Sequence, residues 1–412
     1  MTSLHKYWVW FKSGTYYKVA LLGTGNILNA GMGFLYILAV AKSLGVEDFG
    51  KYVLLAGILV STAKLLDFGT NSLFVAKTIK NSMADTKPEI ESFINSKVYL
   101  FFISLGVSYT AIAYFRLINV TTILLTTLGI IGYLIYYILY GIFHKNENFQ
   151  MLLLLNFIPG SIKGLFGALI LLNFIELSYL GYFFVFIIAI FSILAIYPQA
   201  NIPGIFVKPN FTNFASKIKE SYMAGMSQFI NESWPSINSG LIKNFLSFSN
   251  VAVYSIADKM SDVFSLLSLA IFTVLLPKNA RNKGRNTKYN FNEVLLLTTV
   301  IMFLAVVCYL GSVYVINNFL DGEYRKSIGL LGVLIFNSAI MAVTAFMEHH
   351  FYVEEKPKYL LVTNSVRLAT LLTLSWLLLP SLGILGLAIS NIVSTTLGFL
   401  LIAVFVRKIN VY

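Results

Sequence analysis

The stretch Lys42-Ser43-Leu44-Gly45-Val46-Glu47-Asp48-Phe49-Gly50-Lys51-Tyr52 separates two long apolar runs, 19–41 and 53–76. Each run is long enough to cross a hydrocarbon layer of roughly 30 Å as an α-helix. We therefore expect 42–52 to form a turn at the membrane surface. Gly45 and Gly50 can adopt positive φ without steric cost, and Tyr52 suits the headgroup boundary. The stretch thus predicts a helical hairpin that spans a membrane.

The composition of the whole chain supports a location in a bilayer. Hydrophobic residues make up 57% and charged residues 12% of its 412 residues, whereas a water-exposed surface carries roughly 25–35% charged residues. With the first two, the further apolar runs predict twelve transmembrane helices. These further runs lie at 98–115, 121–143, 149–173, 177–197, 222–246, 251–277, 292–316, 327–351, 359–379 and 382–406.

The connections between the runs are short and contain no apolar pattern for a separate catalytic domain. Three prolines, Pro198, Pro203 and Pro209, favour an extended chain where one of the longest connections begins. We therefore predict an all-α polytopic membrane protein with about twelve transmembrane helices in two six-helix bundles and a cleft between them. The N-terminal bundle would cover 1–200, a cytoplasmic linker 201–220, and the C-terminal bundle 221–412.

The basic residues predict the orientation. If the N-terminus is cytoplasmic, most of them fall on the inner side, Lys97 included, as the positive-inside rule requires. The chain would then cross the cytoplasmic membrane many times with both termini inside. The formal net charge of +12 does not predict nucleic-acid binding, because the basic cluster from Lys278 to Lys288 lies at a helix end that faces anionic lipid headgroups.

A motif connects the first turn with the second apolar run. Leu44-Gly45-x-Glu47-x-Phe49-Gly50-x-Tyr52, followed by Asp67-Phe68-Gly69, resembles the opening of the polysaccharide exporters, the O-antigen-type flippases of lipid-linked oligosaccharides. Their multidrug/oligosaccharidyl-lipid/polysaccharide exporter superfamily also holds lipid II flippases and multidrug-extruding cation antiporters. The number and spacing of the apolar runs extend the resemblance over the whole chain. It implies a structural or gating place for Asp67-Phe68-Gly69.

The resemblance implies a transporter and not an enzyme. Its substrate would be an isoprenoid-pyrophosphate-linked oligosaccharide, flipped by ion-coupled alternating access during polysaccharide biosynthesis. No cofactor is expected, apart from H⁺ or Na⁺ as the coupling ion. The expected partners are the substrate, membrane lipids, a polysaccharide polymerase and glycosyltransferases.

Two alternatives to this function stay open. The first is a multidrug or organic-cation antiporter of the same superfamily, for which we would expect a net acidic, aromatic cavity. The second is a membrane-embedded glycosyltransferase or polymerase, for which the outer loops are short. No nucleophile elbow, phosphate-cradling loop or acidic metal pair occurs in the sequence, so no catalytic or metal-binding residue is predicted.

Ionisable residues inside the apolar runs are the candidate site residues, because each costs roughly 2.5–3.5 kcal/mol at the centre of a membrane helix. Lys64 and Asp67 are three residues apart and are expected to pair. Lys163 lies beside Pro159 and Gly160 in a predicted broken helix, where its ammonium would bind an anion. Alternatively, the Lys163 side chain reaches the headgroups.

Glu232 is the best candidate for ion coupling. It has no basic neighbour within one helical turn, and Pro235 frees the carbonyl of Asn231 from its helical bond. Alternatively, Glu232 is protonated and hydrogen-bonded across helices. In the run 251–277, Lys259 is expected to neutralise one of Asp258 and Asp262 and to leave the other for a cation.

Arg367 is the strongest candidate for contact with a phosphate group, because a planar guanidinium binds phosphate with two hydrogen bonds. Alternatively, its side chain extends to the inner headgroups. We assign Lys64, Lys163, Lys259 and Arg367 to the pyrophosphate, Asn26 and Asn29 to sugar hydroxyls, and Glu232, Asp258 and Asp262 to the coupling ion. More generally, the tyrosines and asparagines of the runs 19–41, 121–143 and 222–246 would meet the sugar hydroxyls, with Asn26 and Asn29 as the best candidates.

Overall fold

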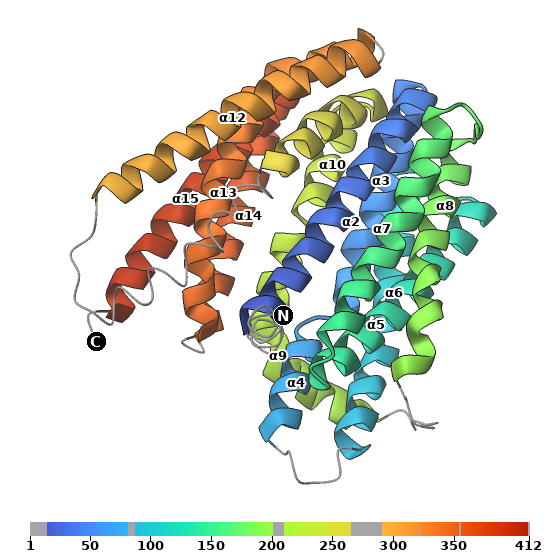
Figure 1. The fold of residues 1–412 in the computed structure, drawn as a ribbon, viewed down its shortest axis with the longest axis vertical. Coiled ribbons are helices and arrows are strands. Elements are labelled where there is room, and N and C mark those ends of the chain that lie inside the picture. Colours follow the sequence, from blue (N-terminus) through green and yellow to red (C-terminus); the bar gives the residue numbers. More distant parts are fainter. Residues whose placement is uncertain are drawn as a thin grey trace, which may run out of the picture. The chain divides into compact units, whose positions relative to one another are not determined.

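The structure is a computed structural model that describes residues 15–80, 87–200, 210–264, 291–320, 322–353 and 356–410, and every structural statement below concerns these residues (Figure 1). They form helices and connecting turns, with no strand among them. The helices, in chain order, are α2 Thr15–Ser43, α3 Val46–Ala63, η1 Lys64–Leu66, α4 Thr70–Lys80, α5 Lys87–Tyr114, α6 Val120–Lys145, α7 Phe149–Leu171, α8 Tyr179–Phe191, η2 Ser192–Ala200, α9 Phe211–Glu232, α10 Trp234–Phe245, an unlabelled helix over 248–264, α12 Phe291–Phe319, η3 Gly322–Ser327, α13 Ile328–Val353, α14 Pro357–Leu382 and α15 Ile384–Asn410.

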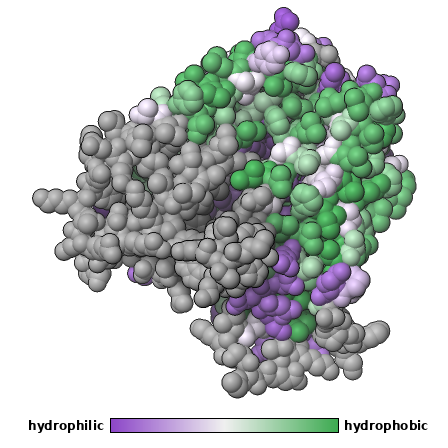
Figure 2. Space-filling view, in the orientation of Figure 1, coloured by the Kyte–Doolittle hydropathy of each residue, from purple (hydrophilic) through white to green (hydrophobic). Residues whose placement is uncertain are grey.

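Nine segments of the described chain are long and apolar enough to cross a membrane. Large apolar side chains point outward from several of them: Phe102 is 64% exposed and Trp376 is 68% exposed. Figure 2 shows hydrophobic side chains over most of the described surface on one face, with hydrophilic ones gathered near helix ends. Such a surface suits lipid and not water. The predicted all-α polytopic fold class is confirmed.

The contacts divide the chain into two compact units. Unit 1 comprises Met1–Ser43 and Leu55–Ser233, and unit 2 comprises Leu44–Leu54 and Trp234–Tyr412. The boundary therefore runs through α3 and between α9 and α10. Of the linker predicted at 201–220, residues 201–209 lie outside the described part and 211–220 form the first turns of α9. The halves 1–200 and 221–412 stay a prediction.

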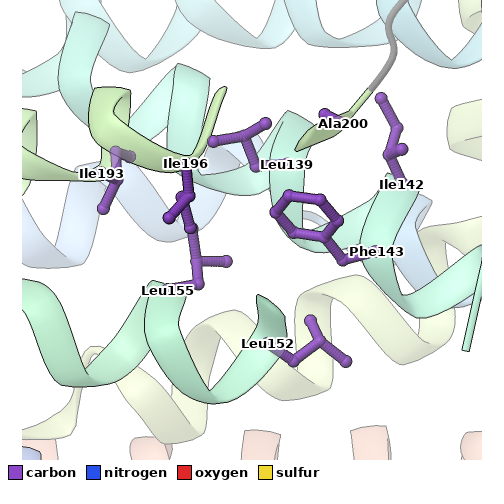
Figure 3. Packing of buried hydrophobic residues seen from close by; sticks show 8 residues of the cluster. All are labelled: Leu139, Ile142, Phe143, Leu152, Leu155, Ile193, Ile196 and Ala200. Atoms are coloured by element: carbon purple, nitrogen blue, oxygen red, sulfur yellow. The ribbon is translucent and has the colours of Figure 1, made fainter. Parts of the chain in front are cut away.

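Unit 1 has a core of aliphatic side chains from α6, α7 and η2. Figure 3 shows Phe143 of α6 among these side chains, with Leu155 of α7 and Ile196 of η2 in the same cluster. Pro198 lies within the 3₁₀-helix η2, so the extended chain predicted to begin there is wrong. The missing amide of proline is compatible with the end of a short helix.

The expected turn over 42–52 is much shorter than predicted. α2 ends at Ser43 and α3 begins at Val46, so only Leu44 and Gly45 connect them. Glu47 and Asp48 lie in the first turn of α3, where carboxylates interact favourably with the helix dipole. The sequence reading failed because these charges suggested an aqueous loop, whereas they begin a helix.

Leu44, Phe49, Gly50 and Tyr52 of the motif are buried within unit 2, whereas Gly45 and Glu47 are exposed. Neither Gly45 nor Gly50 has a positive φ, contrary to the expectation. Gly50 is instead needed for a close approach, because a Cβ there would clash with the carbonyl oxygen of Phe248. Tyr52 is 3% exposed, so its side chain packs inside the protein, and its place at the headgroup boundary stays a prediction. Phe49 lies edge-on to Tyr324, with 6.0 Å between ring centroids.

The second part of the motif breaks a membrane span. Val46–Thr78 is one span by length and hydropathy, but it is interrupted by η1 and by the turn that contains Phe68 (φ 37°) and Gly69 (φ 74°). The backbone at Phe68 lies against α9 at Gly225. A Cβ on Gly225 would clash with the Phe68 carbonyl oxygen. Asp67 Oδ1 accepts a hydrogen bond of 3.1 Å from the Asn71 amide at the start of α4. Asp67-Phe68-Gly69 thus forms a break between η1 and α4 that packs closely against α9.

α7 continues through Pro159 from Phe149 to Leu171, so the predicted break at this proline is wrong. The adjacent glycines bring α7 close to α2, and these two helices run side by side (Figure 1). A Cβ on Gly160 would lie 2.7 Å from Asn29 Oδ1, and one on Gly167 would lie 3.0 Å from Tyr36 Cα. The glycines therefore serve helix packing.

Candidate functional site

The centre of unit 1 contains an ion pair between two helix ends. Lys64 begins η1, near the middle of the span Val46–Thr78, and Glu232 is the last residue of α9. Lys64 Nζ lies 2.5 Å from Glu232 Oε2, and the two side chains are 29% and 31% exposed. Gln228 Nε2 donates a 3.0 Å hydrogen bond to Glu232 Oε1. A paired but accessible charge in a membrane span is the arrangement expected of a functional group.

A helix break lies beside Glu232, where one helix over 222–246 with a freed Asn231 carbonyl was predicted. α9 ends at Glu232, Ser233 forms a turn, and α10 begins at Trp234. The carbonyl of Asn231 accepts a hydrogen bond from the Ser233 amide, so it is not released as an ion ligand in the way that the sequence suggested. Glu232 itself faces Lys64, a partner that is distant in sequence.

Four tyrosines of α6 lie beside this pair: Tyr133, Tyr136, Tyr137 and Tyr140. Their spacing of three and four residues places them on one helix face. Tyr136 and Tyr140 stack with 6.2 Å between ring centroids, and the Tyr136 hydroxyl donates to Asn156 Oδ1 at 2.8 Å. Rings with attached hydroxyls offer both flat apolar surface and hydrogen bonds. Tyr136 and Tyr140 are partly buried against the aliphatic core of unit 1, and Tyr137 is 6% exposed.

A second lysine, Lys97, contacts the helix break between η1 and α4. Lys97 of α5 is 0% exposed, although we expected it at the inner membrane surface. Its Nζ donates to Leu66 O at 2.8 Å, Thr70 Oγ1 at 2.9 Å and Asn71 Oδ1 at 2.5 Å. The sequence reading missed Lys97 because it assigned the basic residues before the next apolar run to the surface. Its position inside the span Pro88–Tyr114 was the available signal.

The predicted pairing of Lys64 with Asp67 is wrong. Lys64 pairs with Glu232, whereas Asp67 Oδ1 lies 4.0 Å from Lys97 Nζ. Asp67 is also engaged by the Asn71 amide at the start of α4. η1 ends between Lys64 and Asp67, so these two side chains do not share a regular helix face. Each of them pairs with a residue of another helix, Lys64 with Glu232 and Asp67 with Lys97.

The other predicted residues of unit 1 lie apart from the Lys64–Glu232 pair. Lys163 Nζ lies 5.2 Å from the ring centroid of Phe186 on α8, and no carboxylate of the described chain forms an ion pair with it. The side chain of Asn29 packs on Gly160 of α7. The side chain of Asn26 lies outside the described residues.

In unit 2, Arg367 of α14 is enclosed by neighbouring helices. It is 1% exposed, so the alternative in which it extends to the headgroups is wrong. Its Nη1 donates to Asn364 Oδ1 at 2.9 Å and lies 3.9 Å from Glu348 Oε1 on α13. The Arg367 guanidinium also lies 4.9 Å from the ring of Trp234. Glu348 is thus the acidic partner that the sequence did not reveal.

Lys259 and Asp262 form the ion pair that was expected in the helix over 248–264. Lys259 Nζ lies 2.6 Å from Asp262 Oδ2, so Asp258 is the carboxylate that Lys259 does not contact directly. One turn earlier, the Tyr254 hydroxyl accepts a 3.1 Å hydrogen bond from Asn391 Nδ2 of α15. Asn391 Oδ1 accepts from Trp234 Nε1 at 2.6 Å, which extends this buried network to α10. The sequence reading did not identify Asn391.

The fold was compared with known proteins. No protein-family model and no curated protein sequence matches the chain. Among solved structures, the lipid II flippase MurJ in an inward closed conformation aligns with a TM-score of 0.66 and 14% identity, over 94% of this chain and 87% of that one. The MATE multidrug transporter DinF-BH aligns with a TM-score of 0.62 and 15% identity, over 94% of each chain.

A third structure has the same fold. It is an inward-facing multidrug resistance MATE family transporter of the MOP superfamily, with a TM-score of 0.59 and 13% identity over 94% of this chain and 95% of that one. The chain therefore shares its fold with a lipid II flippase and with multidrug transporters. The resemblance seen in the sequence is confirmed at the level of fold, and the O-antigen flippase subtype stays a prediction.

Proposed function

We propose that the protein is a transporter of the cytoplasmic membrane that flips an isoprenoid-pyrophosphate-linked oligosaccharide by ion-coupled alternating access. The observation that carries the proposal is the Lys64–Glu232 pair, a partly exposed lysine and carboxylate at helix breaks inside a membrane-spanning fold. The fold that it shares with a lipid II flippase supports a lipid-linked substrate.

The charges of unit 1 favour an anionic substrate. Away from their ends, its membrane-spanning helices hold three lysines, Lys64, Lys97 and Lys163, and one carboxylate, Asp67, and Glu232 at the end of α9 adds a second carboxylate. The excess is therefore one positive charge. A pyrophosphate would replace Glu232 at Lys64, and the released carboxylate would bind H⁺ or Na⁺. Ion and substrate binding would thus be linked at one pair of side chains.

The tyrosine face of α6 would receive the sugar. Tyr136 and its acceptor Asn156 provide hydroxyl and amide groups, and the stacked rings provide apolar surface for the faces of pyranose rings. In this proposal both termini are cytoplasmic, the surrounding lipids are the second partner, and a polymerase and glycosyltransferases consume and supply the substrate. The protein needs no catalytic residue for this task.

A multidrug or organic-cation antiporter is the second candidate, because two MATE transporters share the fold. The charges of unit 2 favour this candidate. Lys259 pairs with Asp262 and Arg367 lies near Glu348, and Asp258 beside Lys259 adds a third carboxylate, so these five residues have an excess of one negative charge. A cationic substrate would be attracted to this excess.

Transport by proteoliposomes separates the two candidates. Vesicles with the purified protein are loaded with a fluorescent isoprenoid-pyrophosphate oligosaccharide in one experiment and with an organic cation in the other. We expect flipping of the lipid, reduced about tenfold or more in Lys64→Met and Glu232→Gln, which corresponds to about 1.4 kcal/mol or more of lost interaction. Lys42→Met, an exposed lysine at the end of α2, is the matched control. Cation efflux without lipid flipping would replace the proposal by the second candidate.

A further inference from the structure

The helix break in unit 1 creates a small group of buried oxygens. The Thr70 amide bonds to the Asp67 carbonyl at 2.7 Å and not to the carbonyl of Leu66, which would be its partner in a continuous α-helix. The Leu66 carbonyl oxygen, together with Thr70 Oγ1 and Asn71 Oδ1, lies within hydrogen-bond distance of Lys97 Nζ. Leu66 is 0%, Thr70 4% and Asn71 2% exposed. Buried oxygens of this kind require a donor or a cation.

The Lys97 ammonium occupies the centre of this group. Its three contacts, at 2.8, 2.9 and 2.5 Å, use a backbone carbonyl, a hydroxyl and an amide oxygen. An ammonium has three N–H donors, so these contacts use all of them. Asp67 Oδ1, 4.0 Å away, provides the opposite charge. Aromatic rings complete the enclosure, with Phe93 at 4.7 Å and Tyr137 at 5.7 Å from Nζ to the ring centroids.

We propose that the break between η1 and α4 is a binding site for a small monovalent cation, and that the Lys97 ammonium is its tethered occupant. Free backbone carbonyls at the end of a helix, together with hydroxyl and amide oxygens, are the ligands that hold Na⁺ at broken helices in membranes. The C-terminal end of a helix adds negative potential at this place. These oxygens are therefore suited to any small monovalent cation. In the native chain the cation is the Lys97 ammonium.

This assignment goes beyond the proposed function and is independent of the substrate. It predicts a ligand class for the site once the lysine is shortened: alkali ions and primary alkylammonium ions. Replacement of Lys97 by alanine removes three methylenes and the ammonium, a gap that matches n-propylammonium. In the native chain the site is filled, so exchange of Na⁺ for another cation leaves the stability unchanged.

The test measures thermal unfolding of the full-length protein in detergent, followed by tryptophan fluorescence. Wild type and Lys97→Ala are compared in chloride salts of choline, Na⁺, K⁺ and n-propylammonium at equal ionic strength. In choline, we expect Lys97→Ala to unfold at a lower temperature than the wild type. n-Propylammonium should raise its Tm in a saturable manner, by about 2–4 °C or more. The Tm of the wild type should not depend on the cation.

Three further variants decide what the result means. Lys97→Ala/Asp67→Asn removes the counter-charge, and we expect it to lose the response to n-propylammonium. Lys163→Ala, which removes a membrane-span lysine without a carboxylate partner among the described residues, should not respond to the amine. Lys97→Met keeps the volume of the stem without the charge and should unfold at a lower temperature than the wild type.

Two outcomes would overturn the proposal. One is a Tm of Lys97→Ala that does not respond to any small cation. The other is a Tm of Lys97→Met equal to that of the wild type, since the charge would then be dispensable. If Lys97→Ala cannot be purified in choline, its purification in n-propylammonium supports the proposal. If it cannot be purified in either salt, the comparison of Lys97→Met with the wild type gives the answer.

Discussion

Lys64 Nζ lies 2.5 Å from Glu232 Oε2, although the two residues belong to different helices and are distant in sequence. Each residue stands at a helix break, Lys64 at the start of η1 and Glu232 at the end of α9. The pair therefore joins the two interrupted segments of unit 1. Any rearrangement of either break changes the separation of these charges.

The first prediction concerns the coupling within this pair. Lys64→Met and Glu232→Gln each leave one charge without its partner in a partly buried place, whereas the double variant leaves neither. We expect the two single changes to be non-additive by about 0.5–3 kcal/mol in the free energy of unfolding. A double-mutant cycle with thermal or denaturant unfolding in detergent measures this quantity. Additive effects would show that the two side chains do not stabilise one another.

The second prediction concerns the crossing of the helix break with α9. Gly225→Ala places a Cβ against the backbone carbonyl of Phe68, which has no flexible end that can move aside. We expect a loss of about 1–3 kcal/mol in the free energy of unfolding, as for other overpacked positions. Gly33→Ala is the matched control, because a Cβ there meets nothing within 4 Å. Equal stability of the two variants would mean that the crossing is looser than described.

The third prediction separates the two glycines of the sequence motif. Gly50→Ala pushes a Cβ into the carbonyl oxygen of Phe248 and should destabilise the protein by about 1–3 kcal/mol. Gly45→Ala should have little effect, because its φ is not positive and a Cβ there meets nothing within 4 Å. Thermal unfolding of both variants provides the measurement. If Gly45→Ala lowered the Tm more than Gly50→Ala, the motif would depend on the backbone freedom of Gly45 and not on the close approach at Gly50.

The fourth prediction concerns the buried arginine of unit 2. Arg367→Met leaves Glu348 without its cation, and breaking such a buried pair costs about 3–5 kcal/mol. Glu348→Gln in the same chain removes the remaining charge, so the double variant should regain part of the lost stability. The measurement is the Tm of the two single variants and of the double variant. If Glu348→Gln brings no recovery in the Arg367→Met background, the 3.9 Å contact is not an effective ion pair.

A related change tests the space around Arg367. Gly398→Ala would press a Cβ on the Cγ and Cδ atoms of Arg367, close to the backbone where the side chain has little freedom. We expect a lower Tm than in the wild type. A Gly398→Ala variant with unchanged Tm would mean that the arginine can take another rotamer inside unit 2.

Much of the fold was predictable from hydropathy. The helices α6, α7, α14 and α15 begin and end within several residues of the apolar runs, because only a hydrogen-bonded helix satisfies its backbone in lipid. α5 begins at Lys87, well before its predicted run 98–115. One helix was expected over 222–246, whereas α9 ends at Glu232 and α10 begins at Trp234, with Pro235 in its first turn, where a missing amide is tolerated. The expected break at Pro159 was wrong, because its lost hydrogen bond is tolerated where Gly160 packs on α2.

The partners of the charged residues could not be predicted from spacing. Lys64 and Asp67 are three residues apart, and the rule for such pairs assumes an uninterrupted helix. The turn at Phe68 and Gly69 invalidates this assumption, and tertiary contacts then assign Glu232 to Lys64 and Lys97 to Asp67. A single sequence contains no signal for contacts between residues so far apart in the chain.

The amide of Asn391 gives the buried network of unit 2 a fixed direction. An indole N–H can only donate, so the contact with Trp234 Nε1 determines which side of the amide carries the oxygen. The nitrogen must then face Tyr254 and donate to its hydroxyl oxygen. The phenolic hydrogen is consequently turned away from Asn391, whereas an aspartate at this position would reverse it, because a carboxylate oxygen can only accept from the Tyr254 hydroxyl. One tryptophan thereby determines the proton orientation two side chains away.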